Sequence, residues 1–256
     1  MIRKANAIGP ILALVICLLA VKAAVADEPP VCLATENQPI CTCDLAKLRP
    51  LQGAVGMKQV IYMENRIADH PKHARGKLEE DPIKVVAGVG GQLFIIDHHH
   101  TAEAWLRAKT EWGAKAFCKI VNSEKGLPPE FKTEDEFWAA LKAADLVRLK
   151  NESGVDVEAS QLPKTLEAMA DDPYRSLAWF VRQKGGFCKT PREFAEFAWA
   201  DWFRSKSATL ENKNLPSDPN DKNATVDEAV EMAHSSEAEG LPGHSAANCI
   251  EFLAHR

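Results

Sequence analysis

Short apolar runs separated by turn residues predict strands and helices in the first half of the chain. The runs Pro82–Ala87 and Leu93–Ile96 are rich in β-branched and apolar residues and flank a glycine-rich turn, which predicts a β-hairpin. Ala116–Val121 has the same character and predicts a further strand. Helical spacing predicts a helix over Lys58–Ala68 and another that follows the histidines and continues to about Trp112. This part of the chain is therefore expected to form a small α/β unit.

The second half of the chain has the apolar periodicity of helices. Thr133 is an expected N-cap, and Asp172-Pro173 places an N-cap aspartate before a proline at the first helical position. Helices are predicted over residues 134–150, 163–170, 174–183, 191–204 and 226–239. The predicted fold class is α+β, an α/β unit followed by a helical half.

The first 26 residues have the pattern of a secretory signal. Arg3 and Lys4 precede the apolar run Ile8–Val25, and the small residues Ala24-Val25-Ala26 follow at its end. An uncleaved membrane anchor is the alternative, but the run is short for a span and contains Lys22. Cleavage after Ala26 leaves a mature chain of residues 27–256, which we expect to be exported, periplasmic or secreted, without a further transmembrane segment.

The cysteines favour disulfide bonds. Loss of the signal leaves six of them: Cys32, Cys41, Cys43, Cys118, Cys188 and Cys249. An even number in an exported chain indicates disulfides, with fifteen pairings open. Cys41 and Cys43 are too close to be an expected pair, so each is expected to reach elsewhere, with Cys32 a natural neighbour. The alternative is a thiolate metal site formed by these three residues.

The domain organisation follows from these shifts in composition. We expect a Cys-rich arm over residues 27–47, an α/β domain over 48–125, and a helical part over 126–256 packed on that domain. The net charge of −5 gives no broad basic surface for coating DNA.

A histidine run at the end of the hairpin is the first candidate site. The chain passes from an apolar strand through Asp97 and three histidines directly into a helix, and the N-terminus of a helix favours anions. The candidate catalytic residues are Asp97, His98, His99, His100 and Glu103. His98 and His100 are the candidate metal ligands, because they share a face if the strand continues. A metal-bound water, with an imidazole as acid or base, would suit phosphodiester hydrolysis.

A structural interpretation of the same histidines stays open beside the catalytic one. In it, His100 caps the helix and His99 is buried against Trp105.

The start of the helix predicted over 174–183 is the second candidate site. Arg175 and Ser176 lie on its first turn, and Arg182 follows one or two turns later. We expect Arg175 to face the histidines and to supply an anion contact there, with Thr101 at the histidine corner. Arg49, beside Pro50, is a weaker contributor to anion binding.

The residues of both candidate sites resemble a known family. Asp97–Ala104, D-H-H-H-T-A-E-A, is similar to the D-G-H-H-R-L-E-A string of the ParB/sulfiredoxin superfamily, and Leu48–Pro50 fits the same domain. Asp171–Trp179, Phe197–Phe203 and Leu241–Gly243 resemble the ParB-like nuclease branch. The resemblance covers nearly the whole mature chain and implies an α/β unit with a mixed sheet.

Two positions depart from the superfamily pattern. The glycine and the arginine that hold a nucleotide phosphate there correspond to His98 and Thr101. Glycine lets the backbone approach a phosphate closely, and arginine binds it with two hydrogen bonds. These departures argue against nucleoside triphosphate binding of the superfamily kind, and an exported chain does not fit chromosome partitioning.

The leading hypothesis is an exported ParB-like domain protein that acts as a nuclease or other phosphoester hydrolase through the histidine corner. Its expected partner is a phosphate-containing ligand or a nucleic acid, and a divalent metal is a candidate cofactor. The alternative is a non-catalytic binding protein that kept the fold and holds a small anion or a metal.

Overall fold

A five-stranded mixed sheet forms the centre of the N-terminal part. The computed structural model describes residues 29–33, 40–206, 214–247 and 249, so the predicted signal lies outside the described residues. The sheet has the order β1-β6-β4-β5-β2, with β1 (Cys41–Asp44), β2 (Arg49–Pro50), β4 (Ile83–Ala87), β5 (Leu93–Ile95) and β6 (Lys115–Ile120). β4 pairs antiparallel with β5, as the predicted hairpin requires, and parallel with β6. The predicted mixed sheet is confirmed.

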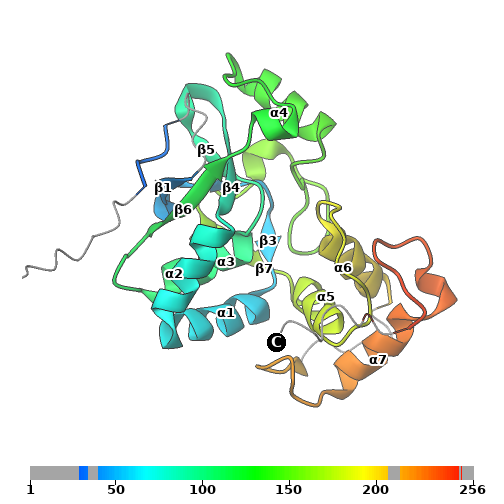
Figure 1. Cartoon of the computed structure of the whole chain (residues 1–256). Helices are drawn as coiled ribbons and strands as arrows, with labels where there is room; N and C mark the ends of the chain where they lie inside the picture. The colour runs from blue at the N-terminus through cyan, green and yellow to red at the C-terminus, as the bar shows by residue number, and fades with distance from the viewer. Residues whose placement is uncertain (1–28, 34–39, 207–213, 248, 250–256) are drawn as a thin grey trace, which may run out of the picture.

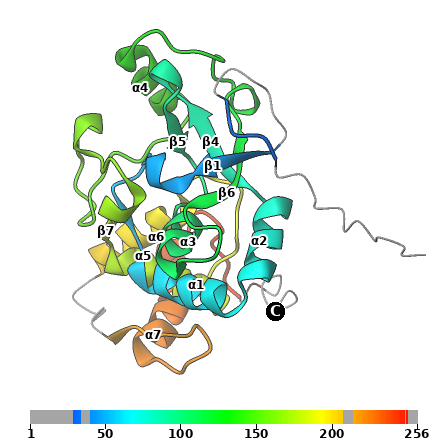
Figure 2. The same cartoon turned by 90° about the vertical axis from the view of Figure 1, so that its left-hand side faces the viewer.

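Helices cover both faces of this sheet. The helices α1 (Met57–Asp69), α2 (Pro71–Glu80) and α3 (His99–Ala108) lie below it in Figure 2, and α4 (Glu134–Ala143) lies at the opposite end. The strands alternate accordingly: Val85 packs in the core that contains residues of α3, whereas Val86 packs in the core that contains Phe137 of α4. Alternate residues of a strand point to opposite faces, so the near-continuous apolar strands reflect burial on both sides.

The C-terminal part has a core of its own. It is formed by α5 (Pro173–Gln183), α6 (Ala195–Ser205) and α7 (Ala224–Ala233), with Phe180, Trp199 and Phe203 fully buried among them. In Figure 1 these helices lie beside the α/β unit. The two parts are joined by a parallel pair of two-residue strands, β3 (Ala54–Val55) and β7 (Ala170–Asp171). That pairing brings the start of α5 next to the start of α1.

Several predicted helix boundaries are wrong, and two of them have a visible structural cause. No α-helix forms over residues 163–170, because Ala170 is drawn into the pairing of β7 with β3 and only a 3-10 turn remains before it. α4 stops before residue 150 because Asp145 takes a left-handed conformation with φ 55°. The short 3-10 helices are Leu45–Lys47, Val89–Gly91, Ser123–Lys125, Ala159–Gln161, Leu166–Ala168 and Ser236–Ala238.

All six cysteines outside the predicted signal pair as disulfides. The bonds join Cys32 to Cys41, Cys43 to Cys118 and Cys188 to Cys249, with Cα–Cα distances of 4.8, 5.8 and 5.4 Å. Cys32 is thus the partner of one of the two close cysteines, as expected, and the alternative thiolate metal site is ruled out. The end of the Cys-rich arm is part of the sheet as β1. Among the described residues, no helix has the length and apolar character to cross a membrane.

Candidate functional site

The first turn of α3 presents free backbone N–H groups to a cavity. The residue before the helix, His98, has φ 69° and ψ 24°, a left-handed conformation that glycine adopts most easily. This explains why the superfamily pattern has glycine there. Within the described part of the chain, the N–H groups of His99, His100 and Thr101 have no hydrogen-bond partner. The helix dipole and these N–H groups together favour an anion at this point.

The rings of His99 and His100 are buried and accept hydrogen bonds from backbone N–H groups. Nε2 of His99 accepts a hydrogen bond from the N–H of Leu51 at 3.3 Å, and Nε2 of His100 accepts one from the N–H of Gly56 at 2.9 Å. Burial lowers the pKa of His99 to about 3, and burial beside Arg175 lowers the pKa of His100 well below its usual value. Both rings are therefore neutral near pH 7, with the proton on Nδ1.

His100 is one of three side chains that cap the start of α1. The N–H groups of Gly56–Lys58 donate in turn to Nε2 of His100 at 2.9 Å, Oδ1 of Asp171 at 2.9 Å and Oγ of Ser176 at 3.2 Å. Gly56 permits this arrangement, because a Cβ at that position would lie 2.7 Å from the backbone nitrogen of Ser176. Ser176 is thus structural and does not line the cavity at α3.

His98 differs from its two neighbours, because its ring lines the cavity. Its Nε2 lies 3.2 Å from Oδ2 of Asp81, and its Nδ1 is buried without a partner among the described residues. The preceding Asp97 accepts from the N–H of His98 at 2.7 Å and pairs with Lys84 at 3.2 Å. Burial raises the pKa of Asp97, but the charges of His98 and Lys84 outweigh it, so that pKa is below its usual value.

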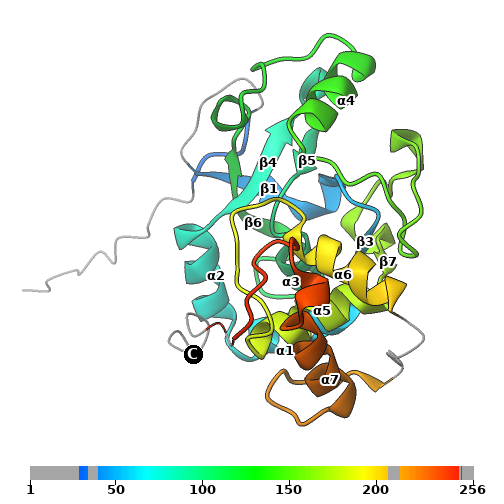
Figure 3. The same cartoon turned by 90° about the vertical axis from the view of Figure 1, so that its right-hand side faces the viewer.

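A cavity of about 470 Å³ separates this corner from the helical half. The first cavity, as we call it, has the start of α3 on one side and the segment Phe187–Phe197 on the other. Figure 3 shows this segment rising beside α3 before α6 begins. Arg175 and Arg182 of α5 also line it, so Arg175 faces the histidine corner as expected.

Charges in the first cavity are mostly paired. Its basic side chains are Lys84, Lys125, Arg175, Arg182, Lys189 and Arg192. Its acidic side chains are Asp81, Asp97, Glu193 and Glu196. Lys125 pairs with Glu193, and both arginines of α5 pair with Glu196. Lys189 and Arg192 are exposed and form no ion pair with any described residue, so the cavity carries an excess of positive charge.

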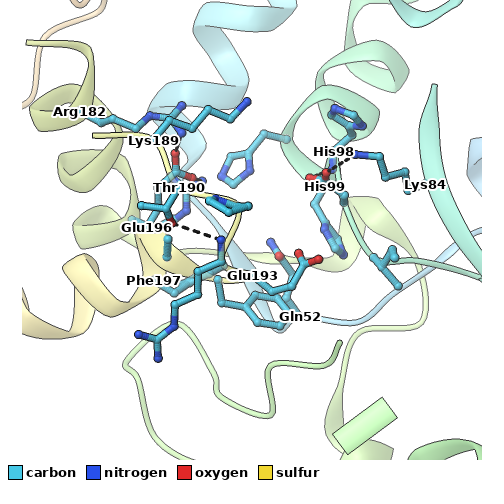
Figure 4. A pocket seen from close by; sticks show the side chains of 18 of the residues that line it. Gln52, Lys84, His98, His99, Arg182, Lys189, Thr190, Glu193, Glu196 and Phe197 are labelled. Atoms are coloured by element: carbon cyan, nitrogen blue, oxygen red, sulfur yellow. Dashed lines mark hydrogen bonds and ion pairs between the residues drawn. The ribbon is translucent and has the colours of Figure 1, made fainter. Parts of the chain in front are cut away.

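Arg175 is the most deeply buried of these basic side chains. Only 5% of it is exposed. It donates to Oε1 of Gln59 at 3.1 Å and to Glu196, and its Nε has no partner among the described residues. Burial raises the pKa of Glu196, but Arg175 and Arg182 outweigh it, so Glu196 stays ionised. Figure 4 shows Arg182 and Glu196 on the side opposite His98 and His99.

A comparison with protein families matches this architecture. The model described as "Putative ParB-like nuclease" matches residues 41–205, which include the sheet, the corner at α3 and the helices α5 and α6. The chain belongs to the ParB-like nuclease family. The matched region therefore contains both sides of the first cavity.

One solved structure is similar over most of the chain. The crystal structure of protein Atu1540 from Agrobacterium tumefaciens has a TM-score of 0.61 and 28% sequence identity, and the match covers 80% of this chain and 95% of that one. No curated protein matches the sequence.

Besides Ser176, two residues expected at the candidate site of this ParB-like family member lie outside the first cavity. Glu103 is buried in α3 away from the first cavity, with 3% of its side chain exposed and Oε2 unpartnered among the described residues. Burial, only partly offset by Arg107, raises its pKa to about 7. Arg49 lies with its guanidinium 5.3 Å from the ring centre of Phe94 and does not line the cavity.

The expected metal pair of His98 and His100 does not fit this family member. Nε2 of His100 is already the acceptor for Gly56, and Nδ1 then carries the proton, which leaves no lone pair for a metal. Among the described residues, no group of three or more His, Cys, Asp or Glu side chains could hold a metal ion. We therefore derive no step through a metal.

Three residues that the sequence did not predict also line the candidate site. Asp81 at the end of α2, Gln59 in α1 and Glu196 in α6 all line the first cavity. The departure at Thr101 is the one feature of the sequence that indicates further site residues. A phosphate site that lacks its usual arginine needs a cationic side chain from another part of the chain. That signal points to Arg175, but not to Gln59 and Glu196, which bind Arg175, or to Asp81, which contacts His98.

Proposed function

We propose that this protein is an exported phosphoester hydrolase that binds a phosphate group in the first cavity. The free N–H groups of His99–Thr101 and the side chain of Arg175 would contact the phosphoryl oxygens, because both line the cavity and both have donors without a partner among the described residues. Lys189 and Arg192 add unpaired positive charge at its edge. Arg175 takes the role that the arginine of the superfamily pattern has and that Thr101 lacks.

The pair of His98 and Asp81 carries the hydrolytic part of the proposal. Nε2 of His98 lies 3.2 Å from Oδ2 of Asp81 in the same cavity as the anion donors. Water attacks phosphorus and gives its proton to Asp81, while the Nε2 proton of His98 goes to the leaving oxygen as its bond to phosphorus breaks. Asp81 then returns the proton to His98. Asp97, paired with Lys84, fixes the position of His98.

The buried histidines have a supporting role in this proposal. His99 and His100 hold the first turn of α3 against Leu51 and Gly56, which keeps its N–H groups directed at the cavity.

Export is the second part of the proposed function. It is supported by the signal-like pattern of residues 1–26 and by three disulfide bonds, which persist in oxidising compartments. The proposed domain limits are the arm 27–47, the α/β domain 48–125 and the helical part 126–256.

The purified, oxidised protein should be assayed on single-stranded DNA, RNA and an activated phosphodiester, in EDTA and with added Mg²⁺ or Mn²⁺. We expect turnover in EDTA, and a loss on the order of 100-fold or more in His98→Ala and in Asp81→Asn, the usual size of an acid–base contribution. His73→Ala, at an exposed position of α2, is the matched control and should be unaffected.

The rival function, binding without turnover, is favoured by one observation: in two of the three histidines, Nε2 already accepts a hydrogen bond from the backbone. Inorganic phosphate binding by calorimetry, with no cleavage of any substrate, would establish the rival. Cleavage that persists in His98→Ala and Asp81→Asn would remove this site from the mechanism.

A further inference from the structure

Residues 187–197, which line the first cavity on the side of the helical half, are fixed by few bonds of their own. Among the described residues, the backbone groups of residues 189–193 form no hydrogen bond with other backbone groups. The ion pairs of this segment lie towards its end, at Glu193 and Glu196. The positions of Lys189 and Arg192 therefore depend on what holds the beginning of residues 187–197, which we call the cavity wall.

The beginning of the cavity wall is held by a segment close to the C-terminus. Residues 241–247 and Cys249, which we call the C-terminal strap, form the red trace beside the yellow one in Figure 3. The N–H of Cys188 donates to the carbonyl of Gly243 at 2.8 Å, and the N–H of Cys249 donates to the carbonyl of Gly185 at 3.0 Å. The strap thus pairs with the chain where the wall begins.

Gly243 lets the strap approach the wall closely. It has φ 74°, and a Cβ at this position would lie 2.1 Å from the carbonyl oxygen of Cys188. One residue earlier, the carbonyl of Pro242 accepts from Nε1 of the buried Trp199 at 2.7 Å. The strap is therefore anchored to the core of the helical half at α6 while it holds the start of the wall.

A disulfide bond also joins the strap to the wall. Cys188 lines the first cavity and is half-buried, and its partner Cys249 is 5% exposed. The other two disulfides contribute no residue to this cavity. Hydrogen bonds that can be exchanged for bonds to water contribute little net stability, whereas a disulfide restricts the chain even when such bonds open. The covalent bond is therefore the strongest link between strap and wall, and only oxidation forms it.

We propose that oxidation of Cys188 and Cys249 fixes the cavity wall in place, so that the first cavity takes its anion-binding form only in an oxidising compartment. Both thiols lose their hydrogens as the S–S bond forms, and a disulfide oxidant takes up the two electrons and two protons and becomes two thiols. In the reduced chain the wall separates from the strap, and Lys189 and Arg192 leave their places at the cavity. This goes beyond hydrolysis, and only the effect on binding rests on the proposed phosphate site.

Hydrogen exchange measured on the full chain tests the order of the wall. We expect the protection factor of the backbone N–H at position 188 to be tenfold or more lower in Cys188→Ser/Cys249→Ser than in the oxidised wild type. The N–H of Val121, which donates to Val85 in the α/β unit at 2.9 Å, should keep its protection and shows that the variant is folded. Equal protection at position 188 in variant and wild type overturns the proposal, and so does an equal loss at positions 188 and 121.

The matched control is Cys32→Ser/Cys41→Ser, which removes a disulfide of the N-terminal arm. Protection at position 188 should be the same in this variant as in the wild type. A loss there as large as in Cys188→Ser/Cys249→Ser would show that any missing disulfide loosens the wall, and would overturn the specific role of the strap.

Calorimetry with inorganic phosphate tests the effect on binding, with the control variant as the starting protein. Mild reduction with a dithiol should open the bond at Cys188, which lines the cavity, and spare Cys43 and Cys118, which are both buried. We expect phosphate affinity to fall tenfold or more on reduction and to return on reoxidation with oxidised glutathione, which excludes misfolding as the cause. Equal affinity in the two states overturns the control of binding by oxidation. Absence of phosphate binding to the oxidised wild type contradicts the phosphate site instead, and protection at position 188 still decides whether oxidation fixes the wall.

Discussion

The starts of α1 and α3 are contrasting helix N-termini within the same part of the fold. At α1, the first three N–H groups all donate to side chains, those of His100, Asp171 and Ser176. At α3, the corresponding N–H groups have no partner among the described residues and point into a cavity beside Arg175. The start of α1 is closed by side chains, whereas the start of α3 is left open at the first cavity.

The contrast between the two helix starts shows that the three consecutive histidines differ in what they contact. The side chain of His100 closes α1 while its backbone N–H is part of the open end of α3. His98, two positions earlier, has no capping role at α1 and lines the cavity with Asp81. Consecutive histidines therefore make different contacts: the ring of His100 caps α1, whereas the ring of His98 lines the first cavity.

The largest expected effect is a loss of stability in acid, caused by the buried His99 and by His100, whose ring caps α1. The folded-state pKa values of His99, about 3, and of His100 lie below the usual 6.5. Between pH 6.5 and 4 the unfolded chain therefore binds protons that the folded protein does not, so stability falls with falling pH. His99 alone should account for about 3 kcal/mol at pH 4, measured by urea unfolding at each pH.

The control for this experiment is the double variant His99→Gln/His100→Gln, which should show a flatter pH dependence in that window. Glu103 acts in the opposite sense, because its raised pKa of about 7 means that stability is lost as pH rises through that value. Its contribution is the same in both proteins and cancels in the difference. Parallel pH curves for wild type and double variant would contradict neutral, buried histidines.

Removing one cap should open α1 partly. His100→Ala leaves the N–H of Gly56 buried without an acceptor, which should cost about 2 kcal/mol, whereas His100→Gln keeps an acceptor near the position of Nε2 and should cost less than half as much. The free energy of unfolding in urea measures both. Equal losses in the two variants would show that the ring matters for its volume and not for the hydrogen bond.

The smallest effect on stability is expected at the open end of α3. His98→Gly removes a side chain from a left-handed position and should raise the free energy of unfolding by about 0.5 kcal/mol, since relief of strain slightly exceeds the entropy that glycine adds to the unfolded chain. Hydrolysis should nevertheless be lost, so stability and activity change in opposite directions. A destabilised but active variant would contradict both the strain and the proposed role of His98.

The strand-to-helix corner that forms the candidate site could be predicted because it depends on local sequence. A strand that ends in Asp97 and a helix that begins at His99 define the corner whatever else the chain does. The structural roles of His99 and His100 could not be predicted in detail, because their partners, Leu51 and Gly56, are 48 and 44 residues away. The alternative interpretation, in which His100 caps its own helix, differs from the structure for the same reason, because its ring caps α1.

In the helical half, a helix could be predicted from the sequence where its N-cap signal is strong. It could not be predicted where pairing with a distant strand decides the local structure. Asp172 caps α5 as expected, accepting from the N–H groups of Tyr174 and Arg175. The helix expected over 163–170 is lost to a two-residue strand that only β3 induces. Glu196 has no local feature that places it between two arginines, so that contact depends on how α6 docks.

The capped start of α1 has a consequence for how the protein folds. The three capping residues are His100, Asp171 and Ser176. They lie 44, 114 and 118 positions after the N–H groups that they cap, so α1 cannot be completed before both the histidine corner and α5 have docked. Such long-range dependence slows folding and couples the two parts. Trp105 of the α/β unit and Trp199 of the helical half should therefore report one shared cooperative transition.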